Sequence, residues 1–253
     1  MPTRRLKVTV AYTGTGFVGW QVQARGRTVQ GEFEAALATM HGHPVRVHAA
    51  GRTDTGVHAD GQVVGFDSDI DSISPERFCI ALNSWLPPDV RAVMSREVDD
   101  RFHARYSATR RVYRYYWSAE AVVHPAAAGR VTRLKHRPSV ANLNRLAGPL
   151  LGRHDFSTFT PPTEPSDNRV REVTHAAFFP RGTFLVFEIA ANAFLWRMVR
   201  SVAGTLIELD KLGAGPIEVA RRLAACDHAA AGPSAPSGGL ALHRVEYPEE
   251  YMP

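Results

Sequence analysis

The stretch AGRTDTGVHADGQ, residues 50–62, sets one aspartate among glycines and has two incompatible interpretations. Asp54, Thr55 and Gly56 spell the tripeptide of the aspartic proteases, whose chemistry needs two carboxylates that share one proton. No second Asp-Thr-Gly or Asp-Ser-Gly occurs in the chain. A symmetric partner would supply one, but Arg52 is close enough in sequence to keep the carboxylate ionised. The stretch therefore favours a lone charged aspartate, which is suited to nucleophilic chemistry.

A second motif, GTGFVG at residues 14–19, fits the GxGxxG fingerprint of dinucleotide-binding folds and follows a predicted strand. That fingerprint requires the last glycine to open a helix whose N-terminus faces a pyrophosphate. Here the residues after Gly19 lack helical apolar spacing, and the next helical pattern begins only at Thr28. A glycine-rich surface loop is the better interpretation, which argues against a nicotinamide-dependent oxidoreductase.

The histidines and cysteines give no metal signature. The eleven histidines include no HxE paired with PCxxC, as a zinc nucleobase deaminase would require. Cys79 and Cys226 lie far apart without a CxxC. The N-terminus enters a strand pattern at once and so lacks the features of a signal peptide, and no apolar run approaches a membrane span. We therefore expect a cytoplasmic protein with no metal, no small-molecule cofactor and no membrane partner.

The charge balance points to an acidic partner. Lys and Arg number 30 against 25 Asp and Glu, for a net charge of +5, and nucleic acid is the commonest acidic partner of a basic protein. The basic residues concentrate in one segment, residues 101–117, where aromatic side chains alternate with them. Guanidinium groups suit phosphates and aromatic faces suit unstacked bases, but a half-buried strand with one charged face fits this segment equally well. The arginines are Arg101, Arg105, Arg110, Arg111 and Arg114.

Hydrophobic periodicity predicts an α+β protein made of two related mixed halves that share a sheet. The division is placed between residues 105 and 106, giving halves 1–105 and 106–253. Residues 229–239 are predicted to be a loop because of their low complexity. Strands are expected at 6–12, 44–50, 62–66, 90–98, 109–118, 170–179, 184–191 and 239–247, and helices at 28–40, 74–85, 139–151, 194–209 and 216–225.

The extended loop GRTDTGVHADGQV (51–63) closely resembles the signature of the tRNA pseudouridine synthase A family. The resemblance covers nearly the whole chain and implies the pseudouridine synthase fold, with two halves sharing an antiparallel sheet and an active-site cleft between them. Ala241 departs from the family pattern, where tyrosine is common. The other matching motifs are GWQVQ (19–23), TVQG (28–31), LP (86–87), FHARYSAT (102–109), RVYRY (111–115), Gly152 with HDFSTF (154–159), ANAFLWRMVRSVAGTL (191–206) and GL (239–240).

The resemblance implies that the enzyme detaches uracil from ribose C1′, turns the base and rejoins it through C5, with no cofactor. Asp54 matches the family's nucleophile and Arg52 the arginine associated with flipping the target uridine. Tyr113 matches the active-site tyrosine that packs on the base, and Arg200 the basic partner of the aspartate. Without the resemblance, Asp54 would be expected to cap a turn and Tyr113 to lie in the core. Further RNA contacts are expected from His58, Arg105, Arg110 and Arg114.

The implied substrates are uridines 38, 39 and 40 in the anticodon stem-loop of tRNAs, held by a homodimer. The sequence leaves open which position is preferred and whether the aspartate attacks C1′ or C6. The alternative function is a non-catalytic RNA-binding protein that uses the same basic and aromatic segment. Such a protein would bind tRNA without releasing the C5 hydrogen of uridine.

Overall fold

The computed structural model describes residues 3–251, which fall into two compact units. The first comprises residues up to 109 together with the segment from 241 onward, and the second comprises residues 110–240. The sequence-based division had placed this final segment in the second half. It belongs with the first unit because strand β10 (Leu240–Glu246) pairs with strand β3 (His58–Ser68). The part that each half plays in function stays a prediction.

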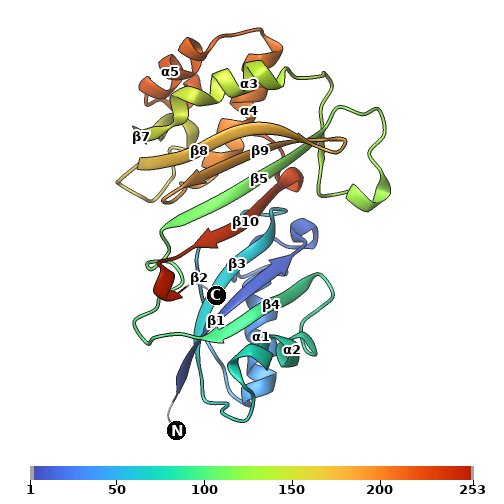
Figure 1. The fold of residues 1–253 in the computed structure, drawn as a ribbon, viewed down its shortest axis with the longest axis vertical. Coiled ribbons are helices and arrows are strands. Elements are labelled where there is room, and N and C mark those ends of the chain that lie inside the picture. The colour runs from blue at the N-terminus through green and yellow to red at the C-terminus, as the bar shows by residue number, and fades with distance from the viewer. Residues whose placement is uncertain (1–2, 252–253) are drawn as a thin grey trace. The chain divides into compact units, whose positions relative to one another are not determined.

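The first unit is built on a sheet whose strands run in the order β4–β1–β3–β10, with the short β2 (His48–Ala49) on β3. Strand β1 (Arg4–Tyr12) is antiparallel to both β3 and β4 (Val90–Glu97), whereas β10 is parallel to β3. Helices α1 (Val29–His41) and α2 (Phe78–Asn83) cover one face of this sheet (Figure 1).

The helix-covered face follows from the alternation in β1. Leu6 and Val8 are fully buried and lie opposite Phe66 and Val64 of β3. Phe33 of α1 meets Phe66 edge to face, with ring centroids 6.4 Å apart. The strand predicted at 6–12 and the helix predicted from Thr28 are both confirmed. Thr28 is the N-cap of α1, since its hydroxyl accepts the Gly31 N–H.

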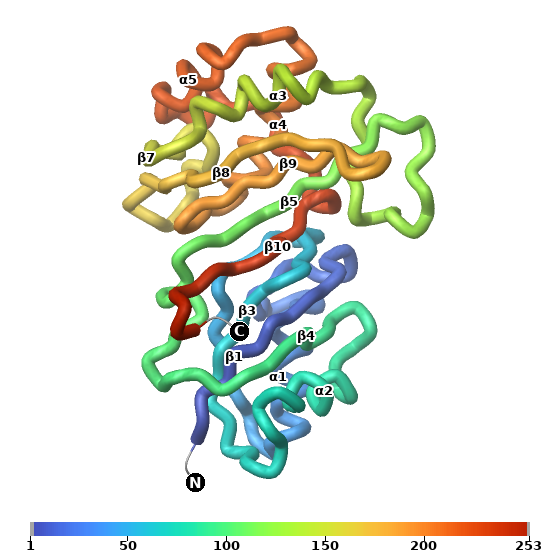
Figure 2. Tube along the Cα trace, in the orientation of Figure 1, coloured from blue at the N-terminus to red at the C-terminus, as the bar shows by residue number. Residues whose placement is uncertain are grey.

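The opposite face of the same sheet is also covered, so Lys7 is buried although it alternates with the apolar residues of β1. Phe102, Tyr247 and Tyr251 form an aromatic cluster over this face, and the C-terminal end returns to it in Figure 2. The Lys7 ammonium donates to the Tyr251 carbonyl and lies 4.5 Å from the centroid of the Tyr247 ring. Burial, helped by Arg96, lowers the pKa of Lys7 from 10.5 to about 8.

The second unit is a sheet in the order β5–β9–β8–β7, with β6 parallel to the end of β5 and helices on one face (Figure 1). A line of stacked rings, Trp117, Phe178 and Phe187, joins three neighbouring strands in its core. The α+β class is therefore confirmed, with mostly antiparallel pairing. The elements are β5 (Arg110–Ser118), β6 (Thr132–Arg133), α3 (Val140–Ala147), β7 (Gly152–Asp155), β8 (Val170–Arg181), β9 (Phe184–Ala191), α4 (Met198–Lys211) and α5 (Pro216–Ala224).

Four predicted elements are clearly shorter than expected. The helix predicted at 74–85 is α-helical only over Phe78–Asn83, after a 3-10 turn that contains Pro75. The strand predicted at 44–50 shrinks to His48–Ala49, because the Val47 N–H donates to the Glu34 carboxylate instead of to a strand. The helix predicted at 139–151 ends as α-helix at Ala147, and a 3-10 turn containing Pro149 follows. The helix predicted at 194–209 begins only at Met198, because Arg197 has a left-handed φ of 59°.

The buried Lys7 predicts a pH dependence of stability. Its pKa is lower in the folded chain than in the unfolded chain, so folding releases a proton between pH 8 and 10.5. The free energy of unfolding should therefore rise with pH, by about 1 kcal/mol between pH 7 and 9.5 after allowance for solvent screening. Lys7→Met should remove this slope. Urea unfolding of both proteins at each pH measures it, and parallel pH profiles for the two would contradict the assignment.

Candidate active site

Asp54 lies in the loop of residues 50–57 that joins β2 to β3, and it begins a tight turn. The Val57 N–H donates to the Asp54 carbonyl over 3.1 Å, and Gly56 occupies the third turn position with a φ of 77°. A positive φ at that position favours glycine, which accounts for the Asp-Thr-Gly sequence without protease chemistry. Asp54 is half-buried and Arg52 is exposed on the same loop.

The turn is held against a second loop, residues 13–28. The Trp20 N–H donates to the Thr53 carbonyl over 3.0 Å, and the Gly56 N–H donates to the Phe17 carbonyl over 3.3 Å. The Thr55 hydroxyl adds a bond of 3.0 Å to the carbonyl of Val18. Bonds therefore flank Asp54 on both sides, which fixes its backbone from residue 53 to residue 56.

The glycines of the GxGxxG motif make this close approach feasible. A Cβ atom on Gly14 would lie 2.0 Å from the Val57 carbonyl oxygen, and one on Gly19 would lie 2.9 Å from the Thr53 carbonyl oxygen. Gly19 also has a φ of 113°. The motif is a loop, as expected, but Gly14 is buried rather than at the surface. Gly14 and Gly19 serve contact between two backbones and not contact with a dinucleotide.

Two buried polar residues that sequence reasoning did not single out anchor the aspartate loop. The hydroxyls of Thr53 and Tyr12 are 2.8 Å apart, and burial raises the pKa of Tyr12, so its phenol keeps its proton. Gln62 of β3 is fully buried and donates to the Gly51 carbonyl over 2.7 Å. Thr53 and Gln62 both lie in the stretch of residues 50–62. Their closeness in sequence to Asp54 is the signal by which sequence reasoning could have found them.

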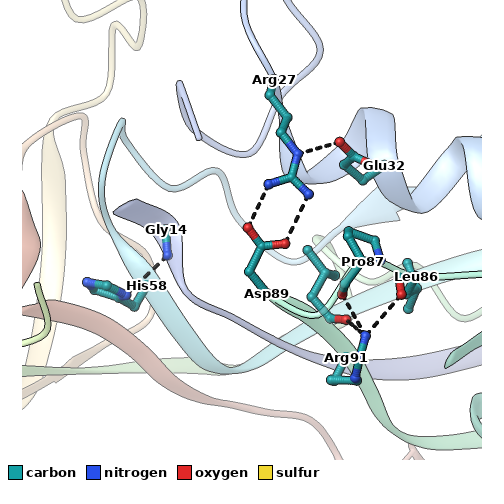
Figure 3. Close-up of polar contacts among 9 residues, drawn as sticks. Gly14, Arg27, Glu32, His58, Leu86, Pro87, Asp89 and Arg91 are labelled. Atoms are coloured by element: carbon teal, nitrogen blue, oxygen red, sulfur yellow. Dashed lines mark hydrogen bonds and ion pairs between the residues drawn. The ribbon is translucent and has the colours of Figure 1, made fainter. Parts of the chain in front are cut away.

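His58, expected to contact RNA, opens β3 as a buried residue. Its Nδ1 accepts the Gly14 N–H over 3.1 Å, which Figure 3 shows. The imidazole thereby links the glycine loop, residues 13–28, to the start of β3. This contact assigns His58 a positioning part beside the aspartate loop, and its contact with RNA stays a prediction.

The glycine loop is fixed at its far end by Arg27. Its guanidinium makes a two-pronged ion pair with Asp89, with distances of 2.6 and 3.0 Å, and also bonds Glu32 of α1 (Figure 3). The paired guanidinium lowers the pKa of Asp89, while Asp89 raises the pKa of Arg27. Arg91 in turn donates to the carbonyls of Leu86 and Pro87. The loop under Asp54 is thus pinned to α1 and to the residues before β4.

The second unit carries the other two candidate catalytic residues. Tyr113 is a buried residue of β5, and its ring meets Phe194 edge to face with centroids 5.2 Å apart. Arg200 lies in the first turn of α4, and its Nε donates to the Ala235 carbonyl over 2.8 Å. The Ala235 N–H donates back to the Arg200 carbonyl over 3.0 Å. Two hydrogen bonds therefore join α4 at Arg200 to the loop that contains Ala235.

The three arginines expected to bind RNA have different surroundings. Arg114 of β5 pairs with Glu188 directly across on β9, with Nε and Oε2 2.7 Å apart, and both side chains are mostly buried. This cross-strand ion pair fits a half-buried strand with one charged face, and a contact of Arg114 with RNA stays a prediction. Arg110 opens β5 and is half-buried. Arg105 lies on an exposed turn, with its guanidinium carbon 5.7 Å from the Tyr106 ring centroid.

The described residues contain neither a metal-binding cluster nor a membrane-spanning helix. Within residues 3–251, no three His, Cys, Asp or Glu side chains gather where they would hold a metal ion. Across the same residues, every helix is too short or too polar to span a bilayer.

Comparison with known proteins identifies the family. A family model described as tRNA pseudouridine synthase matches residues 8–107 and 146–248. The chain belongs to this family. It is therefore an isomerase that converts uridine to pseudouridine in tRNA, and the alternative of a non-catalytic RNA-binding protein is set aside. The matched ranges contain Arg52, Asp54 and Arg200, whereas Tyr113 lies in the interval between them.

Relatives of similar length support the assignment. A tRNA pseudouridine synthase A of Treponema denticola is 40% identical over 98% of this chain and 95% of its own. That of Aeromonas hydrophila is 43% identical over 97% of this chain and 91% of its own. Among solved structures, a Cbf5-Nop10-Gar1 complex matches 93% of this chain and 57% of that chain, at 11% identity and a TM-score of 0.37. A score this low supports no argument.

The glycine loop gives a prediction with an internal control. Gly14→Ala places a methyl group against the Val57 carbonyl, whereas in Gly16→Ala the new atom finds its nearest neighbour at 3.8 Å. Gly14→Ala should lower the free energy of unfolding by about 2 kcal/mol or more and also slow turnover, because the Asp54 turn must shift. Gly16→Ala should behave as the wild type. Thermal unfolding and tRNA turnover of both variants measure the difference, and equal behaviour would refute the packing argument.

Proposed function

We propose that this enzyme isomerises uridines 38, 39 and 40 in the anticodon stem-loop of tRNAs, with Asp54 as the nucleophile. The family assignment supports tRNA as the substrate, and the resemblance of the loop 51–63 to the family signature supports the anticodon arm. The observation that carries the assignment of Asp54 is its position in a turn that is bonded on both flanks. Such rigid support is what covalent catalysis needs, because misplacement by about 1 Å can cost on the order of a hundredfold in rate.

In the proposed reaction the carboxylate of Asp54 forms a bond to the substrate, either at ribose C1′ or at uracil C6. The C1′–N1 bond breaks, the uracil turns, and C5 forms the new bond to C1′. The C5 hydrogen leaves as a proton, N1 is protonated, and the aspartate is released. Atoms and electrons balance without an oxidant or a reductant, and a retaining glycosidase uses a carboxylate in a comparable way.

Three further residues take part in the proposal. Arg52 is exposed beside Asp54, where a side chain that enters the space of a flipped uridine would have to begin. Tyr113 supplies an aromatic face for the uracil, since its ring is already oriented by Phe194. Arg200 is proposed to pair with the aspartate, and its backbone and Nε are fixed by Ala235.

The proposal includes a homodimer that clamps the anticodon arm and acts in the cytoplasm. Its support is the resemblance to the family and the basic charge of the chain. The mass of the protein in solution, from light scattering, tests the dimer directly.

Asp54→Asn keeps the size and hydrogen bonding of the side chain but removes its charge. We expect a folded protein that binds tRNA and forms no detectable pseudouridine, because an amide is a poor nucleophile. Tritium release from C5-tritiated uridine in tRNA measures turnover. Asp71→Asn, an exposed aspartate outside the loop, is the matched control and should release tritium at the wild-type rate. Wild-type release by Asp54→Asn would exclude this nucleophile.

Tyr113→Phe separates the ring of this tyrosine from its hydroxyl. If the hydroxyl handles a proton during turnover, the variant should bind tRNA normally but react more slowly by about tenfold or more. Tyr113→Ala should also lose affinity, because base stacking contributes about 1–3 kcal/mol. Single-turnover rates with saturating enzyme measure the first effect. Tyr116→Phe is the control, because it removes a hydroxyl from the opposite face of β5 and should match the wild type. If Tyr113→Phe also reacts at the wild-type rate, only the ring of Tyr113 takes part in catalysis.

A further inference from the structure

Three aromatic side chains form a row of tilted rings on the first unit, away from the turn that begins at Asp54. The rings of His48 and His103 have centroids 5.1 Å apart and are tilted by 39°. The rings of His103 and Tyr106 are 4.4 Å apart and tilted by 35°. Tyr106 ends the row with 76% of its surface exposed, and His48 is also exposed. An aromatic ring held by its neighbours with one open side is a platform on which a further flat group can stack.

The row is rigid because the turn beneath it is closed by hydrogen bonds. The Ser107 N–H donates to the His103 carbonyl over 2.9 Å, and the His103 N–H donates to the Ser107 hydroxyl over 3.0 Å. The His103 Nδ1 accepts the backbone N–H groups of Arg105 and Tyr106. Burial, with the nearby charges of His48, Arg5 and Arg105, lowers the pKa of His103. The imidazole is therefore neutral near pH 7 and stacks as an uncharged ring.

Cations and a cavity border the row. The Arg105 guanidinium lies against the Tyr106 ring, and Arg46 is exposed on the segment before β2. A cavity of about 330 Å³ opens beside His48 and His103, with Arg46 and Arg5 in its lining. This volume falls at the lower end of the about 300–1,000 Å³ of small-ligand sites and accepts a nucleobase. Arg5 binds Asp67 through two nitrogens.

The row is separate from the aspartate loop. His48 pairs with Gly65, which follows His58 by seven residues along β3. At about 3.3 Å per residue, this places the row roughly 20 Å from the start of β3, where the Asp54 loop ends. A distance of this size is spanned by a few nucleotides.

We propose that the His48–His103–Tyr106 row and the adjoining cavity form a second RNA subsite. It takes an unpaired base of the tRNA on the face of Tyr106 and the flanking phosphates on Arg46 and Arg105. Unpaired RNA bases stack on tyrosine, histidine and guanidinium planes, and arginines bind phosphates, so the chemistry of the patch matches this occupant. The proposal rests on tRNA being the substrate but not on the nucleophile or on the anticodon arm.

Equilibrium binding of tRNA tests the subsite with variants of one exposed residue. Tyr106→Ala should raise the Kd by about fivefold or more, whereas Tyr106→Phe should restore the wild-type value because the ring is kept. Trp85→Ala is the matched control, since Trp85 is an aromatic residue 57% exposed elsewhere on the same unit and should bind tRNA normally when replaced. Removing Arg105 or Arg46 should each reduce the slope of log Kd against log salt by about one.

A second readout maps the contact directly. Ultraviolet cross-linking of wild-type enzyme to tRNA containing 4-thiouridine should label the peptide that holds residues 103–106. A Kd for Tyr106→Ala equal to that of Trp85→Ala, with no label on this peptide, would overturn the subsite. A change in solution mass on Tyr106→Ala would overturn it too, by marking the row as a contact between two copies of the chain. If Tyr106→Ala weakens binding while the wild type forms no pseudouridine at positions 38, 39 or 40, the subsite stands and the proposed choice of positions fails.

Discussion

The close approach of two loop backbones is the constraint on which the candidate site depends. The turn that begins at Asp54 contacts the glycine loop through backbone groups, so side chains of ordinary size at Gly14 or Gly19 would push the loops apart. Backbone contacts of this kind are stiffer than contacts between long side chains, because few rotatable bonds lie between the bonded atoms. Thr53 and Gln62 extend the same support into the sheet. The carboxylate that we propose as the nucleophile is thereby carried on a loop whose backbone is held by hydrogen bonds on both flanks.

The arginines of the basic segment divide into two groups by their partners. Arg111 donates to the Asn192 carbonyl over 2.7 Å and Arg114 pairs with Glu188, so both are part of the second unit's own structure. Arg101 is exposed but bound to Asp99. Arg105 lies instead on an exposed turn beside an exposed aromatic ring. Net charge alone is therefore a poor measure of how many cations the strand presents at the surface.

Regular elements with strong periodicity were predictable because each obeys a local rule. Strand β9 was expected at 184–191 and has those bounds, since its apolar run is set between a tight turn and a polar residue. Helix α1 follows the apolar spacing from Val29 and its threonine cap. One error lies where a group outside the segment competes with the local pattern. Glu34 takes the N–H that a longer strand at Val47 would have used, and no local periodicity reports such a partner.

The sequence by itself determined the family and the identity of the candidate nucleophile, because the spacing of residues 51–63 is a contiguous signature. It also determined which residues alternate into the core. Only the tertiary structure decided what Gly14 and Gly19 do, since their partners Val57 and Thr53 lie 43 and 34 residues further along the chain. Only it decided that Arg114 is paired, that His58 holds a backbone amide, and that the C-terminal strand returns to the first unit. Each of these depends on a contact between segments that are distant in sequence, and such contacts leave no local pattern to read.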